Sequence, residues 1–412
     1  MAGLRSLSRC FICVVLVLRV GTVEAGAGEI VNNAPAQPIR RVVLEELWRV
    51  GADDALVLGA PVGVVLDSLG RIVVCDHQLA SLLVLDTVAG TAEVLARSGQ
   101  GPGELGYPVA VANWADGGFG VAEFFPGRIV RISAGGAPAG TIDIDPTPDQ
   151  EGGFTLLTDL CTGGGQVVVT GFYQTPRADG LLRNDFLAAI DDEGLLRIRY
   201  LDRHTVLAPE APVVRERDYL GRLHLTHAVA PDGRVLVASD PERYRLDVFR
   251  PDGSQDRSIV RRFATRPRSA KEIRMIEALF EAWNSGRPDP PVVEVDRDAP
   301  AVEDIQVDAH GRIWVRHADS GRSEESEVFL VLDRFDPAGH WEREVAFVCP
   351  GDRDLDGLVI LDDRRVLVMR HDRLSRLIRF AAIAGRSPTF GLAGENRPLE
   401  LICYEVPGGL MD

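Results

Sequence analysis

Lysine is almost absent from this 412-residue sequence, and acidic residues outnumber basic ones. Lysine and arginine total 45 against 61 aspartates and glutamates, which gives a formal net charge of −16 at pH 7, and Lys271 is the only lysine. Proteins that bind the phosphate backbone of nucleic acids carry an excess of basic residues, so this balance excludes nucleic acid as a partner. The chain is nevertheless 45% hydrophobic. That content excludes a disordered chain, because it supplies enough apolar area for a core.

Long apolar runs are also missing. The N-terminal run Cys10–Leu18 is too short to span a membrane. It follows a basic start at Arg5 and Arg9 and precedes small residues near Ala25, which is the pattern of a secretory signal peptide. We therefore predict a signal peptide over residues 1–25, a flexible mature N-terminus over residues 26–40, and a periplasmic or extracellular location with no membrane span in the mature chain. The alternative is an uncleaved N-terminal anchor.

Cysteine is sparse as well. Two of the six cysteines belong to the predicted leader, and the mature chain keeps four, namely Cys75, Cys161, Cys349 and Cys403. Four cysteines in an exported chain can form at most two disulfides, which are too few to act as the scaffold of a protein of this length. The sequence does not specify their pairing. The protein must therefore be held together by its hydrophobic core.

Turns, in contrast, are abundant, since the chain has 42 glycines and 25 prolines. One unit recurs, in which a Gly or Asp turn leads into a short strand of β-branched residues and then into a second strand. Its copies begin at Asp67, Ala115, Gly163, Pro231, Asp308 and Asp362. Tight turns between short strands build antiparallel meanders, and meanders that recur roughly every 40 to 50 residues are typical of propeller blades. We predict an all-β fold, a six-bladed β-propeller of four-stranded antiparallel blades.

The propeller is predicted to span residues 41–383. Residues 41–50 have strand-like character, and we expect this N-terminal strand to pair with a strand at Leu377–Phe380 and to close blade 6. Closure of this kind removes the open sheet edges that an unclosed ring would expose. Residues 384–412 are left as a C-terminal tail without an assigned role.

One helical insertion is predicted between blades 4 and 5, over residues 268–286. Ser269 and Glu272 have the spacing of a capping box. The apolar residues that follow share one face at helical spacing, and they are Ile273, Ile276, Leu279, Phe280 and Trp283. We expect this helix to pack on the rim or face of the propeller. The alternative is a helix that binds a partner.

Two short segments resemble a known family. The linker Ser98–Pro108, with its Pro-Gly-Glu sequence, and the opening Leu47–Gly51 resemble segments of exported bacterial six-bladed propellers related to the NHL-repeat group. In the family pattern an apolar strand and then the turn and strand pair follow this linker, and the resemblance on that pattern covers nearly the whole mature chain. It implies the propeller fold and an envelope or extracellular location. It implies no chemistry, because a fold does not fix a function.

The repeat also predicts which residue of each blade faces the central channel, because equivalent positions in the six copies should lie at one depth. Counting six residues back from each blade's turn selects Val64, Ala112, Asp159, His227, Ile305 and Leu358. Only Asp159 and His227 can bind a metal, whereas a catalytic metal site needs at least three ligands, so we assign no catalytic residue. Because these two residues occupy equivalent positions in blades 3 and 4, we expect them to be neighbours. We predict either that they bind a polar ligand in the channel or that they form a structural hydrogen bond that bridges the two blades.

An acidic run near the C-terminal end has the spacing of a calcium loop. Asp352, Asp354 and Asp356 match the first half of such a loop, and Asp363 falls at its twelfth position. Calcium is the one cofactor that the sequence suggests. The alternative is an acidic connection between strands, because the residues after Gly357 have the pattern of a strand and not of a helix.

These observations favour a secreted or periplasmic, monomeric, non-enzymatic propeller that binds a small ligand or an envelope protein. One alternative is a metal-dependent enzyme of the lactonase or lyase kind, which needs polar residues converging in the channel. Another is an envelope scaffold that docks through the helical insertion, which needs an exposed apolar patch.

Overall fold

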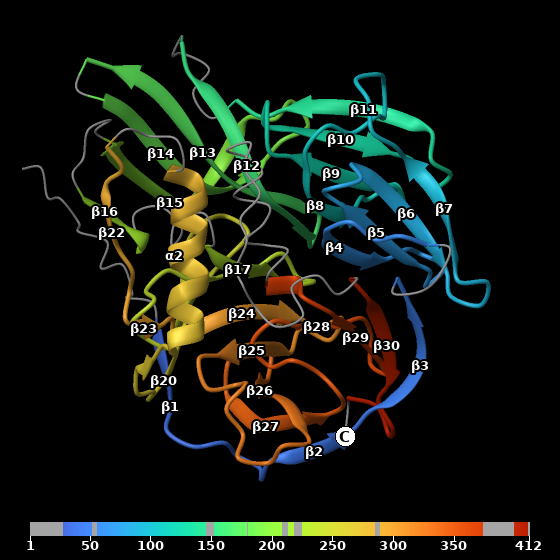
Figure 1. The fold of residues 1–412 in the computed structure, drawn as a ribbon, viewed down its shortest axis with the longest axis vertical. Coiled ribbons are helices and arrows are strands. Elements are labelled where there is room, and N and C mark those ends of the chain that lie inside the picture. The colour runs from blue at the N-terminus through green and yellow to red at the C-terminus, as the bar shows by residue number, and fades with distance from the viewer. Residues whose placement is uncertain are drawn as a thin grey trace, which may run out of the picture.

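The computed structural model of the protein describes residues 28–51, 56–145, 152–178, 180–207, 213–217, 225–284, 289–373 and 399–410. Six sheets, each with a meander of antiparallel strands, surround a central axis and form a six-bladed β-propeller, as the sequence predicted (Figure 1). In each blade one strand is innermost, and the innermost strands of the first five blades pack in succession against one another around the channel.

The first three blades are meanders of four consecutive strands. Blade 1 contains β4 (Pro61–Leu66), β5 (Ile72–Asp76), β6 (Ser81–Asp86) and β7 (Thr91–Ala96). Blade 2 contains β8 (Pro108–Asn113), β9 (Phe119–Glu123), β10 (Arg128–Ile132) and β11 (Pro138–Asp143). Blade 3 has longer strands, β12 (Phe154–Gly163), β13 (Gln166–Arg177), β14 (Gly180–Ile190) and β15 (Leu196–Leu207).

The last three blades each gain a strand from the N-terminal segment. Blade 4 contains β17 (Thr226–Val229), β18 (Val235–Ala238), β19 (Arg245–Phe249), β20 (Gln255–Arg261) and β1 (Gly28–Asn32). Blade 5 contains β24 (Val302–Val307), β25 (Ile313–His317), β26 (Val328–Phe335), β27 (Trp341–Val348) and β2 (Arg40–Val43). Blade 6 contains β28 (Gly357–Ile360), β29 (Arg365–Met369), β30 (Leu401–Glu405) and β3 (Glu45–Val50).

The N-terminal segment therefore crosses the outer edges of three blades. β1 and β2 add parallel strands outside β20 and β27, and β3 pairs antiparallel with β30 as the outermost strand of blade 6. Residues 26–40 were predicted to be flexible, but residues 28–32 of this segment form β1, and the edges of blades 4 and 5 supply hydrogen-bond partners that no local pattern reveals. Covering these edges satisfies backbone groups that would otherwise be open to pairing with another chain.

The third strand of blade 6 differs from the one expected. Residues 377–380 lie outside the described residues, and the place in the sheet is taken by β30, which falls in the segment left as a tail. The blade therefore extends beyond residue 383. About thirty residues separate β29 from β30 in the sequence, which hides the repeat, although the run from Leu401 to Tyr404 is buried on both faces.

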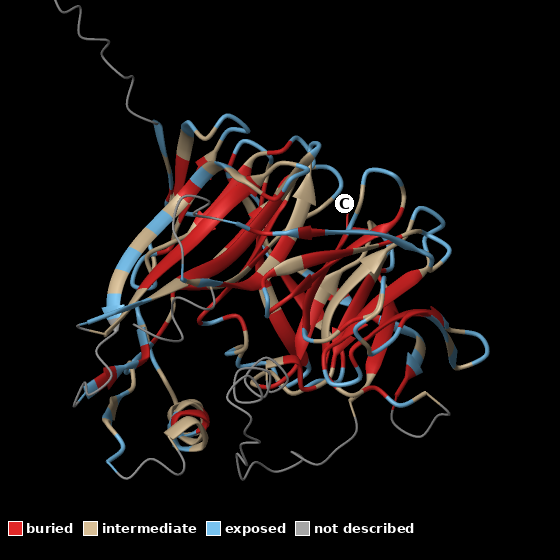
Figure 2. Ribbon diagram, turned by 90° about the horizontal axis from the view of Figure 1, so that it is seen from above, coloured by how far each residue is buried: buried red, intermediate tan, exposed pale blue. Residues whose placement is uncertain are grey.

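The hydrophobic core lies between the blades. The described residues form six clusters of buried apolar side chains, and each joins two neighbouring blades. In one, Val74 of blade 1 and Leu367 of blade 6 belong together, which seals the ring at its closure. Figure 2 shows that buried residues dominate the blade strands, while exposed residues lie mostly on loops and outer strands.

The predicted insertion contains the helix α2 (Ala270–Asn284). The capping box is present, because the Ser269 N–H donates to Glu272 Oε2 at 2.7 Å and the Glu272 N–H donates to Ser269 Oγ at 3.2 Å. Short two-stranded sheets flank the helix, β16 (Val213–Arg215) with β22 (Val292–Glu294) and β21 (Arg266–Pro267) with β23 (Asp298–Ala299). The helix lies on one face of the ring, outside the blades (Figures 1 and 2).

The apolar side of α2 packs on the propeller. Leu279 and Phe280 are each 1% exposed and belong to the core cluster between blades 2 and 3, together with Met275. Ile276 and Trp283 are partly buried against the same cluster. The helix is therefore part of the fold. None of the described helices has the length and apolar character required to cross a membrane.

Candidate functional site between blades 3 and 4

All six positions selected by the sequence register fall in innermost strands, and two of them meet. Asp159 lies on β12 and His227 on β17, and these neighbouring innermost strands pack together. Their ligand atoms lie within 4.8 Å of one another. The expected proximity is therefore present.

A third side chain completes the cluster. Cys161 also has its sulfur within 4.8 Å of the Asp159 carboxylate and the His227 ring, and its Sγ lies 3.6 Å from His227 Nε2. Among the described residues, this is the one group of three or more His, Cys, Asp or Glu side chains whose donor atoms converge this closely. His227 is buried, while Asp159 and Cys161 are half-buried.

A β-bulge sets the direction of the two blade 3 side chains. The pairing of β12 with β13 shifts between Leu157 and Asp159, so Thr158 is the extra residue. Beyond the bulge the strand alternates again, and Leu160 enters the core between blades 2 and 3. Asp159 and Cys161, on either side of Leu160, therefore point together toward blade 4.

The His227 ring is held in one orientation. Its Nδ1 lies 2.9 Å from the backbone oxygen of Leu225. A carbonyl oxygen can only accept, so Nδ1 carries the proton and Nε2 is left as a lone-pair donor. That lone pair faces the sulfur of Cys161.

The electrostatic field at the cluster is negative. Burial raises the pKa of the Cys161 thiol well above its usual range, and the carboxylates of Asp159 and Asp304 raise it further. Asp304 comes from β24, the innermost strand of blade 5. The thiol is therefore protonated at neutral pH unless a cation joins the cluster.

Cys161 was not predicted as a site residue, because the repeat selects one position per blade and the cysteines were interpreted only as disulfide partners. The spacing of Asp159 and Cys161 could have indicated it, since residues two apart on a strand share a face of the sheet. Among the four cysteines of the described part, Cys161 is the only one that is not buried.

The acidic run predicted as a calcium loop does not converge on one point. Asp352, Asp354 and Asp356 precede β28, whereas Asp363 follows it and bonds to His310 Nε2 at 2.8 Å. A strand rises about 3.3 Å per residue, so the two ends of β28 are roughly 10 Å apart or more.

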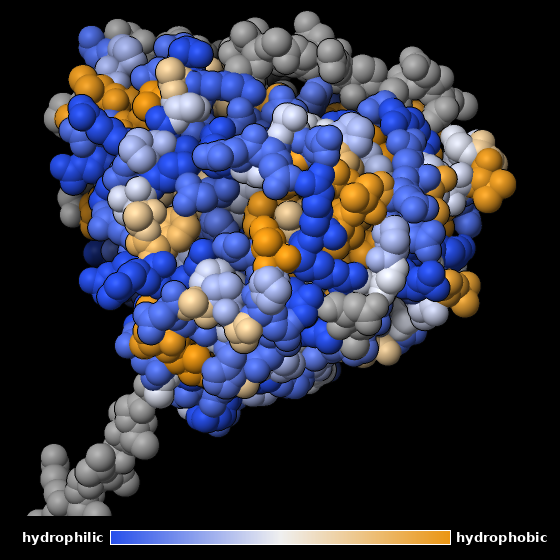
Figure 3. Space-filling view, turned by 90° about the horizontal axis from the view of Figure 1, so that it is seen from below, coloured by the Kyte–Doolittle hydropathy of each residue, from blue (hydrophilic) through white to orange (hydrophobic). Residues whose placement is uncertain are grey.

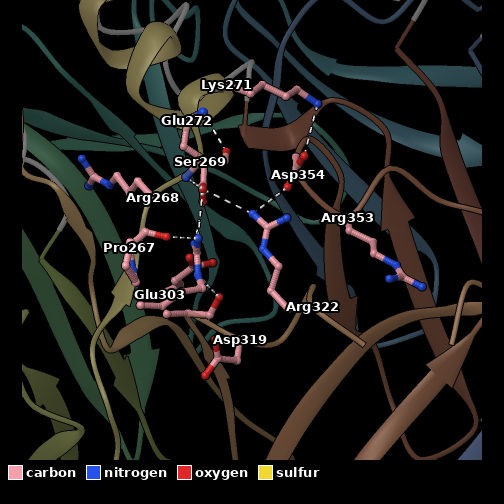
Figure 4. A network of polar contacts seen from close by, with 12 residues as sticks. Pro267, Arg268, Ser269, Lys271, Glu272, Glu303, Asp319, Arg322, Arg353 and Asp354 are labelled. Atoms are coloured by element: carbon pink, nitrogen blue, oxygen red, sulfur yellow. Dashed lines mark hydrogen bonds and ion pairs between the residues drawn. The ribbon is translucent and has the colours of Figure 1, made fainter. Parts of the chain in front are cut away.

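Basic side chains form ion pairs with carboxylates of this run, and Figure 4 shows Lys271 and Arg322 beside Asp354. Lys271 Nζ lies 3.3 Å from Asp354 Oδ2, and Arg322 lies 3.1 Å from the other oxygen of the same carboxylate. Arg370 pairs with Asp356 at 2.6 Å. The run is thus part of an ion-pair network that ties α2 to blades 5 and 6, and we do not propose it as a calcium site.

A cavity of about 690 Å³ opens beside this network, lined by residues that include Arg322, Arg353, Asp354 and Arg370. Arg353 donates to the backbone oxygens of Ser323 and Glu325. The charged groups of the cavity are therefore already engaged with one another or with the backbone, and a ligand would have to compete with these contacts.

No family model matches the chain, and no curated protein matches its sequence. Solved structures with similar shape include virginiamycin B lyase from Staphylococcus aureus, at 9% identity and a TM-score of 0.40, which covers 86% of this chain and 97% of that one. Regucalcin from Agrobacterium tumefaciens, described as a calcium-binding protein, has 14% identity, a TM-score of 0.41 and coverage of 89% and 96%.

A member of the DUF4221 family from Bacteroides vulgatus has 10% identity and a TM-score of 0.46, and it covers 88% of this chain and 97% of that one. Likenesses at these levels carry no argument about what this chain does. The six-bladed fold rests on its own strand pairing.

Proposed function

We propose that this protein is a non-enzymatic binding module that takes a small, positively charged ligand between the innermost strands of blades 3 and 4. The observation that carries the proposal is the convergence of Asp159, Cys161 and His227 within 4.8 Å. No other such group exists among the described residues. Polar side chains that converge from separate strands are the usual mark of a binding site on a rigid scaffold.

The charge of the ligand follows from the residues around it. Asp159 and Asp304 both act on the Cys161 thiol as negative charges, and His227 presents a lone pair. An anion would meet repulsion from the carboxylates and no donor with a full positive charge. A cation would be attracted by every group of the cluster, and the net charge of −16 favours its approach.

The scaffold alternative has weaker support. The helix that was expected to dock a partner buries Leu279 and Phe280 in the propeller itself. Figure 3 shows separate apolar patches among hydrophilic side chains on the surface seen from below, and the N-terminal segment exposes single apolar residues, namely Val31, Ile39, Val43 and Leu47. Nothing in the structure indicates what would cover them.

The enzyme alternative shares the same cluster but needs a reacting group. The neighbour from Staphylococcus aureus is called a lyase, yet the likeness is too distant to transfer that activity. We keep the binding module as the proposal, in the periplasmic or extracellular setting that the N-terminal pattern predicts.

A thermal-melt screen tests the proposal. Wild-type protein, Asp159→Asn and Glu277→Gln are melted with a panel of chlorides of monovalent, alkaline-earth and transition-metal cations and of small organic amines. Glu277 is an exposed residue of α2 and serves as the matched carboxylate control.

We expect at least one cation to raise the Tm of the wild type and of Glu277→Gln but not of Asp159→Asn. If no cation in the panel stabilises the wild type, or if all three proteins shift alike, the proposal is wrong.

A further inference from the structure

We infer that the cluster of Asp159, Cys161 and His227 is a binding site for a thiophilic divalent transition-metal ion of the Zn²⁺ class. The inference rests on the proposed function and names its ligand. It adds a third ligand to Asp159 and His227, the two potential metal ligands that the sequence predicted in the channel.

The first support is the set of donor atoms. A thiolate, an imidazole nitrogen and a carboxylate are ligands that zinc and cobalt accept together. Calcium and magnesium need six or more oxygen ligands, and this cluster supplies a single carboxylate. The residue types therefore select a borderline-soft ion over the hard cations.

The second support is the spacing. In a tetrahedral site, a Zn–S bond of about 2.3 Å and a Zn–N bond of about 2.0 Å place sulfur and nitrogen about 3.5 Å apart. Cys161 Sγ and His227 Nε2 lie 3.6 Å apart. The two atoms could hold a metal without moving either strand.

The third support is the orientation of the ring. Metal-binding histidines usually donate their other N–H to a carbonyl or carboxylate, which fixes the tautomer. His227 does so through Nδ1, toward the Leu225 oxygen, and directs Nε2 at the cluster. Asp159 is also fixed, because its Oδ1 accepts the Leu160 N–H at 2.7 Å.

The fourth support is the charge balance. The carboxylates of Asp159 and Asp304 act on the Cys161 sulfur as negative charges, and they would attract a divalent ion at this position. Coordination requires the thiolate, so a bound ion replaces the proton of the Cys161 thiol, and that proton leaves to solvent.

Three protein ligands leave one position of a tetrahedral ion open. Asp159 and Cys161 are half-buried, whereas His227 is buried. Water or a small anionic group of a second ligand would occupy the fourth position.

Cobalt titration of the tag-free full chain tests the inference. Co²⁺ is added to metal-stripped wild type, Cys161→Ser, His227→Ala and Cys349→Ser, and the near-ultraviolet thiolate-to-cobalt charge-transfer band is recorded. Cys349 is the least buried of the other three cysteines, at 9% exposed, and is the matched control.

We expect one equivalent of Co²⁺ to give the band in the wild type and in Cys349→Ser, one equivalent of Zn²⁺ to abolish it, and Cys161→Ser to lack it. His227→Ala should bind at least about tenfold more weakly. Addition of azide should change the visible cobalt bands, because the fourth position is open.

Absence of a charge-transfer band in the folded wild type overturns the inference without reference to any variant, and so does a band that survives in Cys161→Ser. If the band is absent while another cation still stabilises the wild type and not Asp159→Asn, the metal inference fails and the proposed function stands. If neither result is obtained, both fail.

Discussion

His317 Nε2 and Asp333 Oδ1 face each other at 3.9 Å between β25 and β26 of blade 5, at its contact with blade 4, and neither atom has a hydrogen-bond partner in the described part of the chain. Both side chains are buried, at 5% and 0% exposed. The other Asp333 oxygen accepts from Tyr244 Oη at 2.6 Å and pairs with Arg261 of blade 4. The two blades are thus joined through titratable groups.

Folding shifts the pKa values of these two groups in opposite directions. Burial raises the pKa of Asp333 to about 6, although Arg261 and Tyr244 oppose the shift. Burial, with Arg261 and Arg316, lowers the pKa of His317 to about 3. The Asp333 contribution to stability is present at low pH and is lost as pH rises through about 6. The His317 contribution is present above pH 6.5 and is lost as pH falls toward 3.

We therefore predict that the two contributions offset each other between about pH 4 and 6 and that single variants separate them. In Asp333→Asn the free energy of unfolding should rise with pH across this window relative to wild type, by on the order of 2 kcal/mol. In His317→Asn it should fall by a similar amount. Urea unfolding at pH 4, 5 and 6 measures both slopes, and identical slopes in all three proteins would contradict the prediction.

The contribution of Glu272 to stability depends on pH in the direction that is usual for a carboxylate, since it is lost as the pH falls. Burial alone would raise its pKa, but hydrogen bonds from Arg266 and from the Ser269 N–H lower it to about 2. The ion pair between Arg266 Nη2 and Glu272 Oε1 measures 2.6 Å. The contribution of the ionised Glu272 to the free energy of unfolding is present above about pH 4.5 and is lost as the pH falls toward 2.

Glu272→Gln should therefore lower the free energy of unfolding by about 2 kcal/mol at pH 7 and by much less near pH 2.5. Glu277→Gln, an exposed change on the same helix, should have little effect at either pH. A Glu272→Gln deficit that does not change with pH would mean that the ion pair with Arg266 is not its source.

The fold was open to prediction from sequence because its signals are local. Turn glycines, alternating strands and the Ser269–Glu272 capping box each act within a few residues, and each is found in the structure. β1 and β2 were hidden, because their partners lie more than 200 residues away. Only part of the candidate site could be predicted from the sequence. Asp159 and His227 followed from the repeat, whereas the bulge at Thr158, which directs Asp159 and Cys161, depends on the pairing with β13.

The N-terminal segment should stabilise blade 5 through one side chain. Asn32 is 7% exposed, its Nδ2 donates to the Gly339 oxygen at 3.0 Å, and its Oδ1 accepts the Trp341 N–H at 2.8 Å. Asn32→Ala leaves both backbone groups unpaired and should cost about 1–3 kcal/mol in unfolding free energy. The exposed neighbour Asn33 is the control. Equal urea midpoints for Asn32→Ala and Asn33→Ala would show that the segment does not hold the blade.

The packing of α2 on the propeller decides between a structural helix and a docking helix. Phe280 is 1% exposed within the core cluster between blades 2 and 3, whereas Arg274 lies exposed on the same helix. Phe280→Ala empties a buried site and should lower the free energy of unfolding by about 3–5 kcal/mol, while Arg274→Ala should stay within about 0.5 kcal/mol of wild type. Chemical denaturation with matched m-values gives both numbers. If Phe280→Ala unfolds like Arg274→Ala, the apolar face of the helix is not needed by the fold. It would then be free to bind a partner, and the scaffold alternative would gain over the binding module.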